Sequence, residues 1–144
     1  MPRAAPHVLL VDDNARFLAV LGELLASAAH PLTVHAVTSG SAALAFLERR
    51  APHRTAPRPA CVVLDFHLPD LAAPQLLRCL AGDAALRDIP VLVLSQADWQ
   101  AEAAQALAAG AAHFHLKPSR VRALRDAVVT FCEEAVDGGA RPGR

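Results

Sequence analysis

The sequence predicts an α/β fold: a doubly wound, five-stranded parallel sheet with helices on both faces. Short apolar runs alternate with longer segments in which apolar residues recur at helical spacing, and this alternation occurs five times along the chain. Most of the short runs are apolar throughout, which is typical of strands that helices cover on both faces. This alternation predicts that the strands are parallel within one sheet and that right-handed crossovers join them.

The composition fits a single folded domain. The chain has 144 residues, of which 53% are hydrophobic and 19% are charged, so it can bury a substantial core. Its formal net charge is zero, which argues against a nucleic-acid-binding surface. No apolar run is long enough for a signal peptide or a membrane span, and the three cysteines lack metal-binding spacing. We therefore expect a cytoplasmic protein that binds neither nucleic acid nor membranes directly.

In the first half of the chain we expect two strands and two helices. A strand over Val8–Val11 is followed by Asn14, which can cap a helix that ends at His30-Pro31. The apolar side of this helix is expected to contain Phe17, Val20, Leu21, Leu24, Leu25 and Ala28. The next elements are a strand (Leu32–Val37), a helix (from Ser39 or Ser41 to about Arg50) and a proline-rich loop (51–60).

The second half begins with a buried strand that ends in an acid, Asp65. Pro74 then stands near the start of a helix that ends at Gly82, and Gly110 ends an alanine-rich helix that begins at Asp98. The buried side of that second helix is expected to contain Trp99, Ala103, Ala106 and Leu107. The other elements are strands over Ile89–Leu94 and Ala111–Leu116 and a last helix with Val121, Leu124, Val128 and Phe131.

Polar residues stand at the carboxyl ends of four predicted strands. Asp12 and Asp13 follow the first strand, Asp65 ends the third, Ser95 ends the fourth and Lys117 follows the fifth. In a parallel sheet these ends meet at one edge, where ligands bind in open α/β folds. Any one of these residues has an ordinary explanation as a helix cap, a turn residue or a solvated amine. Their joint placement indicates one site.

The composition of this site indicates phosphoryl chemistry on an aspartate. Three carboxylates in a confined site raise one another's pKa unless a cation joins them, and Mg²⁺ prefers such oxygen ligands. The hydroxyl and the ammonium are suitable partners for a bound anion. A carboxylate can also act as a nucleophile towards phosphorus and form an acyl phosphate. The residues therefore predict magnesium-assisted phosphorylation of Asp65.

Four motifs give the chain a resemblance to a known family. They are VLLVDDN at residues 8–14, LDFHLPD at 64–70, VLVLS at 91–95 and GAAHFHLKP at 110–118. In this order the chain resembles the receiver domains of two-component response regulators, of the chemotaxis-regulator type. The resemblance implies a flavodoxin-like sheet with strand order 2-1-3-4-5. It covers a receiver domain at 7–135, with a lead-in at 1–6 and a flexible tail at 136–144.

The resemblance also implies roles for the site residues. Asp65 matches the phosphoacceptor, and Asp12 and Asp13 match the acid pair that binds Mg²⁺ together with Asp65. Asp13 is expected to be the more direct ligand of that pair, and the backbone carbonyl of His67 a further ligand. Lys117 matches the residue that pairs with the phosphoryl group.

Two residues match the conformational switch of the family. Ser95 corresponds to the hydroxyl that moves towards the phosphoryl group, and Phe114 to the aromatic side chain that rotates in response. The Lys117–Pro118 peptide bond is expected to be cis. The implied partners are a sensor histidine kinase or a phosphotransfer protein and a downstream effector. The implied role is that of a signalling phosphoacceptor with only its own phosphorylation and dephosphorylation chemistry, not that of an enzyme.

Three alternatives stay open at this point. The first is the receiver half of a DNA-binding response regulator, but the segment from Trp99 to Ala109 contributes a single charged residue, Glu102, to a pairing surface. We therefore favour a stand-alone receiver and leave a homodimer open. The second is a phosphohydrolase of the haloacid-dehalogenase type, which needs a general acid where His67 stands. The third is a degenerate receiver that docks without phosphorylation, which the complete set of site residues disfavours.

Overall fold

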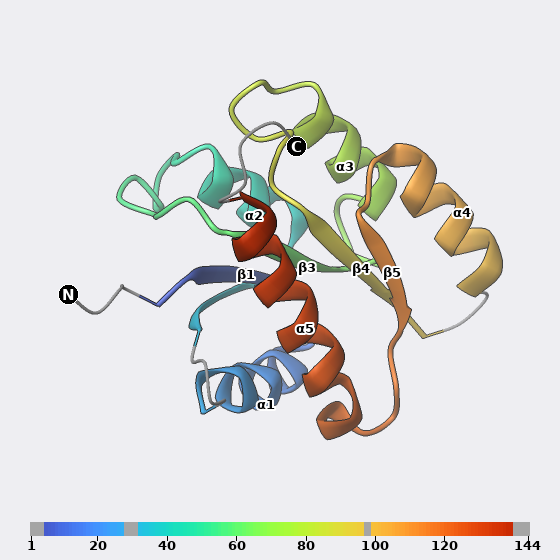
Figure 1. The fold of residues 1–144 in the computed structure, drawn as a ribbon. Coiled ribbons are helices and arrows are strands. Elements are labelled where there is room, and N and C mark those ends of the chain that lie inside the picture. The colour runs from blue at the N-terminus through green and yellow to red at the C-terminus, as the bar shows by residue number, and fades with distance from the viewer. Residues whose placement is uncertain (1–4, 28–31, 97–98, 140–144) are drawn as a thin grey trace.

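The computed structural model describes residues 5–27, 32–96 and 99–139, in which strands and helices alternate as predicted (Figure 1). The apolar runs form the strands because they can be buried on both faces. The strands are β1 (His7–Val11), β2 (Thr33–Val37), β3 (Cys61–Asp65), β4 (Val91–Ser95) and β5 (His113–Leu116). The helices are α1 (Ala15–Ala26), α2 (Gly40–Leu47), α3 (Ala73–Ala81), α4 (Trp99–Ala109) and α5 (Val121–Gly139).

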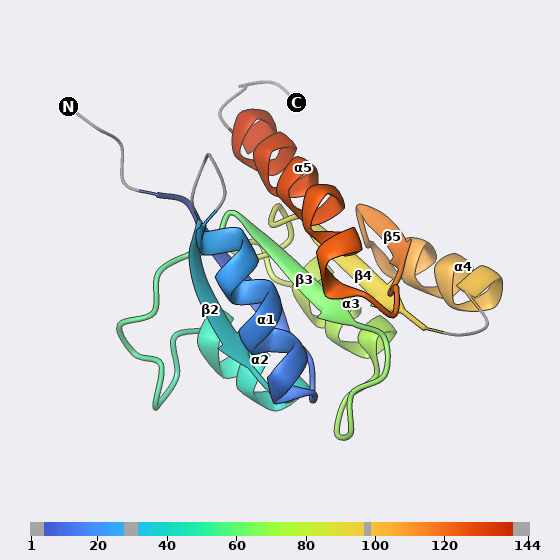
Figure 2. The same ribbon diagram turned by 90° about the horizontal axis from the view of Figure 1, so that it is seen from below.

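All five strands form one parallel sheet in the order β2-β1-β3-β4-β5, so the expected strand order is confirmed. Helices α1 and α5 cover one face of the sheet, and α2, α3 and α4 cover the other (Figures 1 and 2). Alternate side chains of β1, β3 and β4 therefore enter two separate cores. On β1, for example, Leu9 packs with the α2–α3–α4 side and Leu10 with the α1–α5 side.

The helix caps that the sequence predicted are largely confirmed. The Asn14 side chain accepts a hydrogen bond from the Phe17 N–H at 3.1 Å, and Ser39 caps α2 by accepting from the Ala42 N–H. Gly82 is the C-cap of α3, and Gly110 adopts a φ of 117°, a conformation that favours glycine at a helix end. The sequence thus marks where most of these helices begin and end.

Two predicted helix faces need correction. The buried residues of α1 are Phe17, Leu18, Leu21 and Leu25, so Leu18 belongs to the buried face, whereas Val20 is 37% exposed and does not. In α4 the buried positions are Glu102, Ala106 and Ala109, whereas Leu107 is 50% exposed. Apolarity alone does not define a face in an alanine-rich helix, and here the side that packs on the sheet carries the small residues. Ala28 and the side chain of Trp99 lie outside the described residues.

Several predicted boundaries also change. Helix α1 ends at Ala26, and the expected stop at His30-Pro31 lies outside the described residues. Helix α2 ends at Leu47, not near Arg50, and α5 continues to Gly139, so it includes residues assigned to the tail. Among the described residues the cis peptide bond is Ala51–Pro52, so the expectation of a cis Lys117–Pro118 bond is wrong.

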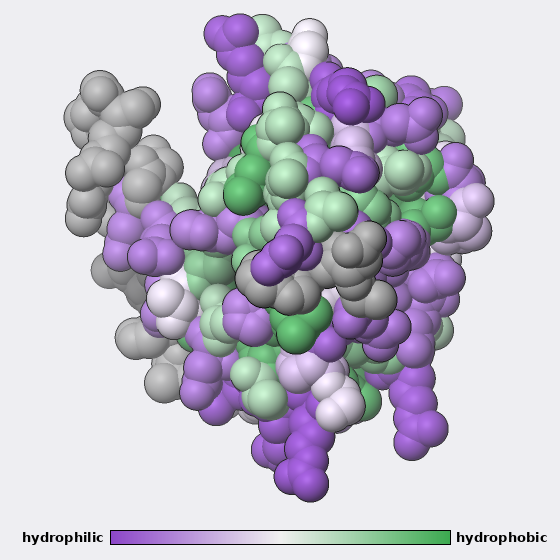
Figure 3. All heavy atoms as spheres, turned by 90° about the vertical axis from the view of Figure 1, so that its right-hand side faces the viewer, coloured by the Kyte–Doolittle hydropathy of each residue, from purple (hydrophilic) through white to green (hydrophobic). Residues whose placement is uncertain are grey.

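The outer side of α4 and β5 carries both apolar and polar residues. Leu107 and Leu116 are among the exposed large hydrophobic residues, and Figure 3, which faces this side, shows apolar and hydrophilic residues interspersed. Among the helices of the described residues, none combines the length and apolarity needed for a membrane span.

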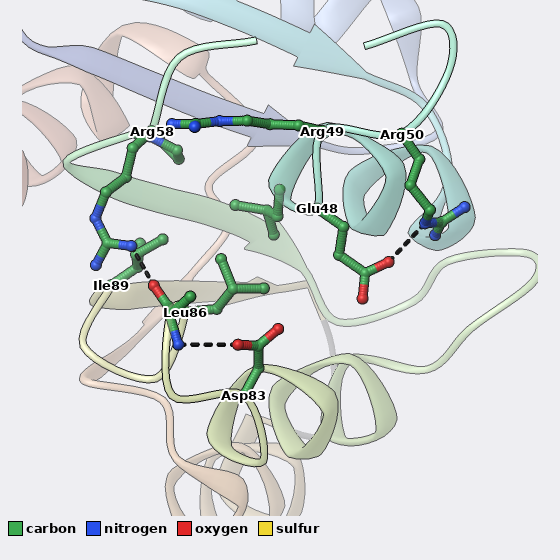
Figure 4. Close-up of a pocket in the computed structure, with 10 residues that line it drawn as sticks. Glu48, Arg49, Arg50, Arg58, Asp83, Leu86 and Ile89 are labelled. Atoms are coloured by element: carbon green, nitrogen blue, oxygen red, sulfur yellow. Dashed lines mark hydrogen bonds and ion pairs between the residues drawn. The ribbon is translucent and has the colours of Figure 1, made fainter. Parts of the chain in front are cut away.

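A pocket of about 560 Å³ lies at the edge of the sheet where β3 and β4 begin, which we call the amino edge (Figure 4). Buried Leu47, Leu86 and Ile89 line it together with charged side chains. Its charged groups bond locally: Arg50 pairs with Glu48, and Arg58 donates a hydrogen bond to the Ala85 carbonyl. The pocket is therefore charged at its rim and apolar within.

Candidate functional site

The strand-end residues converge at the carboxyl edge of the sheet. One carboxylate oxygen from each of Asp12, Asp13 and Asp65 lies within 4.8 Å of the other two. The ammonium of Lys117 lies 2.6 Å from the Oδ2 atom of Asp12. Ser95 ends β4, next to β3 in the sheet, with Asp65 opposite Leu94 in the strand register. The predicted clustering follows directly from parallel strands that end together.

The surroundings of Asp65 make its carboxyl group harder to ionise. Asp65 is 8% exposed, and burial, together with the neighbouring charge of Asp12, raises its pKa to about 6. Asp13 adds to this increase, whereas Lys117 and His67 oppose it. A carboxylate in this environment gains stability when a positive charge arrives, so the site favours a cation.

Both carboxylate oxygens of Asp12 already have partners in the protein. The Asn14 N–H donates to Oδ1 at 2.8 Å, and Lys117 donates to Oδ2. The Lys117 ammonium also lies 4.1 Å from the centre of the Phe17 ring, which supports it from α1. Asp12 and Lys117 are thus fixed, and the exposed Asp13 side chain is the acid of the pair that faces solvent.

This donor set fits Mg²⁺. The ion takes oxygen ligands, keeps several waters and is usually held by one or two carboxylates together with phosphate oxygens. Asp13 and Asp65 offer carboxylates at a solvent-accessible edge, and Lys117 offers a positive charge beside them. The arrangement can therefore hold a divalent cation and an anionic group next to one another.

The loop after β3 is held in place by Asp70. Its carboxylate accepts hydrogen bonds from the N–H groups of Gly40 and Ser41, both at 2.9 Å, at the start of α2. These bonds lower the pKa of Asp70. A Cβ atom at Gly40 would lie 2.6 Å from the Leu71 Cβ, so only glycine permits this close approach. Asp70 thereby anchors the loop that carries His67.

Sequence reasoning missed the part that Glu102 has in this site. This residue of α4 is 8% exposed and accepts a hydrogen bond from the Ser95 hydroxyl. Its other carboxylate oxygen lies 2.6 Å from Nε2 of His67. The available signal was that Glu102 is the single charged residue in α4, four positions before the buried Ala106. A lone charge on the buried side of a helix needs a polar partner.

Phe114 lies on β5 opposite Val93 and is half-buried against the core on the α2–α3–α4 side. It is close to the edge where Ser95 and Lys117 stand, because Ser95 pairs with Leu116 in the same strand register. A rotation of this ring would change the surface formed by α4, β5 and α5. Its role as a switch stays a prediction.

The fold and the site together define a class of α/β protein with an acidic edge that could hold a cation. The chain belongs to the response regulator receiver family, because the family model described as "Response regulator receiver domain" matches residues 8–129. This confirms the resemblance drawn from the four motifs.

Curated relatives agree with this assignment. The chain is 32% identical over 114 residues to two-component response regulator ORR5 of Oryza sativa subsp. japonica, with 79% of each protein covered. It is 32% identical over 119 residues to two-component response regulator ARR15 of Arabidopsis thaliana. This alignment covers 80% of this chain and 57% of that protein.

Solved structures share the fold. The phosphorylated cyanobacterial phytochrome response regulator RcpA superimposes with a TM-score of 0.84 at 26% identity, over 97% of this chain and all of that one. Response regulator RPA3017, in red light signalling of R. palustris, has a TM-score of 0.78 at 26% identity, with 90% of this chain and 92% of that one covered.

Proposed function

We propose that this protein is a phosphorylation-activated receiver that accepts a phosphoryl group onto Asp65 from a sensor histidine kinase or a phosphotransfer protein. The observation that carries the proposal is the convergence of Asp12, Asp13 and Asp65 within 4.8 Å beside the Lys117 ammonium. A similar protein, RcpA, is described as phosphorylated, which supports the same chemistry here. We expect the protein to act in the cytoplasm as a signalling phosphoacceptor and not as an enzyme.

The proposed reaction is an in-line displacement at phosphorus. A carboxylate oxygen of Asp65 attacks, the new P–O bond forms as the P–N bond to the donor histidine breaks, and the electron pair of that bond stays on the imidazole. Near neutral pH the carboxyl group is mostly ionised, because its pKa is about 6, so it can act as the nucleophile. The resulting group is an acyl phosphate.

Each neighbouring group has a defined task in this proposal. Lys117, now paired with Asp12, supplies positive charge to the transferred phosphoryl oxygens. Ser95 donates a hydrogen bond to the phosphoryl group, and Phe114 responds to that movement. Asp13, Asp65 and the His67 carbonyl, with Asp12 beside them, would hold Mg²⁺, which when bound neutralises charge on the phosphoryl oxygens.

Intact-mass analysis after incubation with acetyl phosphate and Mg²⁺ tests the proposal. We expect the wild type to gain the mass of one phosphoryl group and Asp65→Asn to gain none. Asp88→Asn, which changes an exposed acid away from this edge, is the matched control and should be labelled like the wild type. Equal labelling of Asp65→Asn and the wild type would refute Asp65 as the acceptor.

A further inference from the structure

We propose that Glu102 is a positioning residue that competes with the phosphoryl group for the Ser95 hydroxyl and thereby links phosphorylation to the position of α4. The two contacts of its carboxylate, with Ser95 and with His67, are named the Glu102 bridge. The inference rests on the proposed function of Asp65 and adds a regulatory step to it.

The Glu102 bridge joins three elements at the functional edge. One oxygen accepts from the Ser95 hydroxyl at the end of β4, and the other lies 2.6 Å from His67 Nε2 in the loop after β3. The Glu102 side chain is 11% exposed, whereas that of His67 is 67% exposed. The histidine therefore covers the carboxylate from the solvent side, and Ser95 holds it from within.

The hydroxyl of Ser95 cannot satisfy two acceptors at once. A serine has one O–H proton, so it donates either to the Glu102 carboxylate or to an oxygen of a phosphoryl group on Asp65. Both acceptors are charged, and hydrogen bonds to charged groups are stronger than neutral ones. Formation of the phosphorylated state with Ser95 as donor therefore requires that the Glu102 bridge gives up this contact.

The Glu102 bridge is a polar contact on a side of α4 where the other described buried side chains are small. Among the α4 side chains that the structure describes, the buried ones besides Glu102 are Ala106 and Ala109, whose small side chains bury little apolar area. Glu102 is also the only charged residue of α4. Loss of the Ser95 contact would therefore remove the polar contact that ties α4 to the end of β4, on the side of the molecule shown in Figure 3.

Beryllofluoride with Mg²⁺, a phosphoryl mimic for aspartate, is the probe for the test. We expect Glu102→Ala to bind it roughly three- to tenfold more tightly than the wild type, because a competing charged acceptor is removed. In a Ser95→Ala background the same substitution should change the affinity by less than about twofold. Glu133→Ala, which changes an exposed acid on α5, is the matched control and should bind like the wild type.

The pattern across the backgrounds separates three explanations. A general effect of removing negative charge predicts the same gain with or without Ser95, and a merely structural role predicts weaker binding in both. Either result would overturn the Glu102 bridge as a competitor. If Glu102→Ala does not fold, Glu102→Gln replaces it in the test, because glutamine keeps the side chain's size. We expect Glu102→Gln to bind beryllofluoride more tightly than the wild type, by a smaller factor than expected for Glu102→Ala.

Amide hydrogen exchange in α4 provides a second readout. We expect the amides of residues 103–109 to exchange faster in the wild type once the probe binds, and in Glu102→Gln already without it. Unchanged exchange in both cases would contradict the link to α4. If the wild type neither binds the probe nor accepts phosphate on Asp65, the proposed function fails and the competition fails with it. Binding without Ser95 dependence overturns the competition alone.

Discussion

The two edges of the sheet both carry charged side chains but hold them in different surroundings. At the carboxyl edge Asp12 and Asp65 are 2% and 8% exposed, and Asp12 bonds to Lys117, itself from a distant strand end. At the amino edge Arg50 and Glu48 form a pair whose side chains are 58% and 38% exposed (Figure 4). Asp12 and Lys117 are far apart in the sequence, whereas a single residue separates Glu48 from Arg50.

Burial decides what each group can do. Exposed ion pairs are screened by water and contribute little to stability. Buried charges lose their hydration, so each must find a partner or change its protonation, as the raised pKa of Asp65 indicates. The carboxyl edge therefore has unbalanced buried charge that a cation and a phosphoryl group can relieve, whereas the charges at the amino edge are already screened by water.

The largest expected change in the free energy of unfolding follows removal of the buried Lys117 ammonium. Lys117→Met removes the ammonium group that lies beside Asp12, Asp13 and Asp65. Because loss of one partner leaves a buried charge unpaired, we expect the free energy of unfolding to fall by about 3 kcal/mol. Urea denaturation without divalent ions measures this change. Asp12→Asn in the Lys117→Met background should recover part of the loss, and a decrease below about 1 kcal/mol would show that the pair is effectively solvated.

The second effect has the opposite sign. Asp65→Asn should raise the free energy of unfolding at pH 7 by about 1–2 kcal/mol, less than the full pKa shift implies because solvent reaches this edge. The folded-state pKa is about 6 and the ordinary value is 3.8, so the folded wild type binds more protons between these values. Its stability therefore falls as pH rises through this window.

Denaturation of the wild type and Asp65→Asn at several pH values tests that sign. The difference between them should be small near pH 4 and reach its full size above the folded-state pKa of about 6. Asp88→Asn, at an exposed position, should show no such trend. A difference that does not vary with pH would contradict the raised pKa of Asp65.

A smaller loss is expected at the loop that Asp70 anchors. Asp70→Ala removes both hydrogen bonds to the start of α2 and should lower the free energy of unfolding by about 1 kcal/mol at pH 7, as for a lost helix cap. Since these bonds lower the pKa of Asp70, the stabilisation is complete above its ordinary pKa and disappears as pH falls through the lowered one.

Thermal unfolding at pH 7 and at a pH below 3 distinguishes this cause from a general effect of mutation. The wild type and Asp70→Ala should differ at pH 7 and converge in acid. Asp126→Ala, at a side chain that is 92% exposed, should match the wild type at both pH values. Persistence of the full difference in acid would contradict a role for the ionised carboxylate.

The sequence predicted the site because strand ends are defined locally. Asp12, Asp65 and Ser95 directly follow or end apolar runs, and a parallel sheet brings such ends together without further information. The sequence does not predict which side of α4 faces the sheet, because alanines occur on every side of that helix. The pattern therefore predicts a buried Leu107, whereas the structure buries Glu102 and leaves Leu107 exposed. The contact of Glu102 with His67 depends on packing between distant segments, which no local pattern encodes.

The smallest effect is expected at the amino edge. Arg50→Ala removes the 2.7 Å pair with Glu48, but both side chains remain in water, so the free energy of unfolding should change by less than about 0.5 kcal/mol. Acetyl-phosphate labelling should also be unchanged, because Arg50 lines the pocket at the amino edge (Figure 4), whereas Asp65 ends β3 at the carboxyl edge. Urea denaturation and intact-mass analysis measure the two quantities. A loss comparable to that of Lys117→Met would mean that charge at this edge is as little screened as at the other.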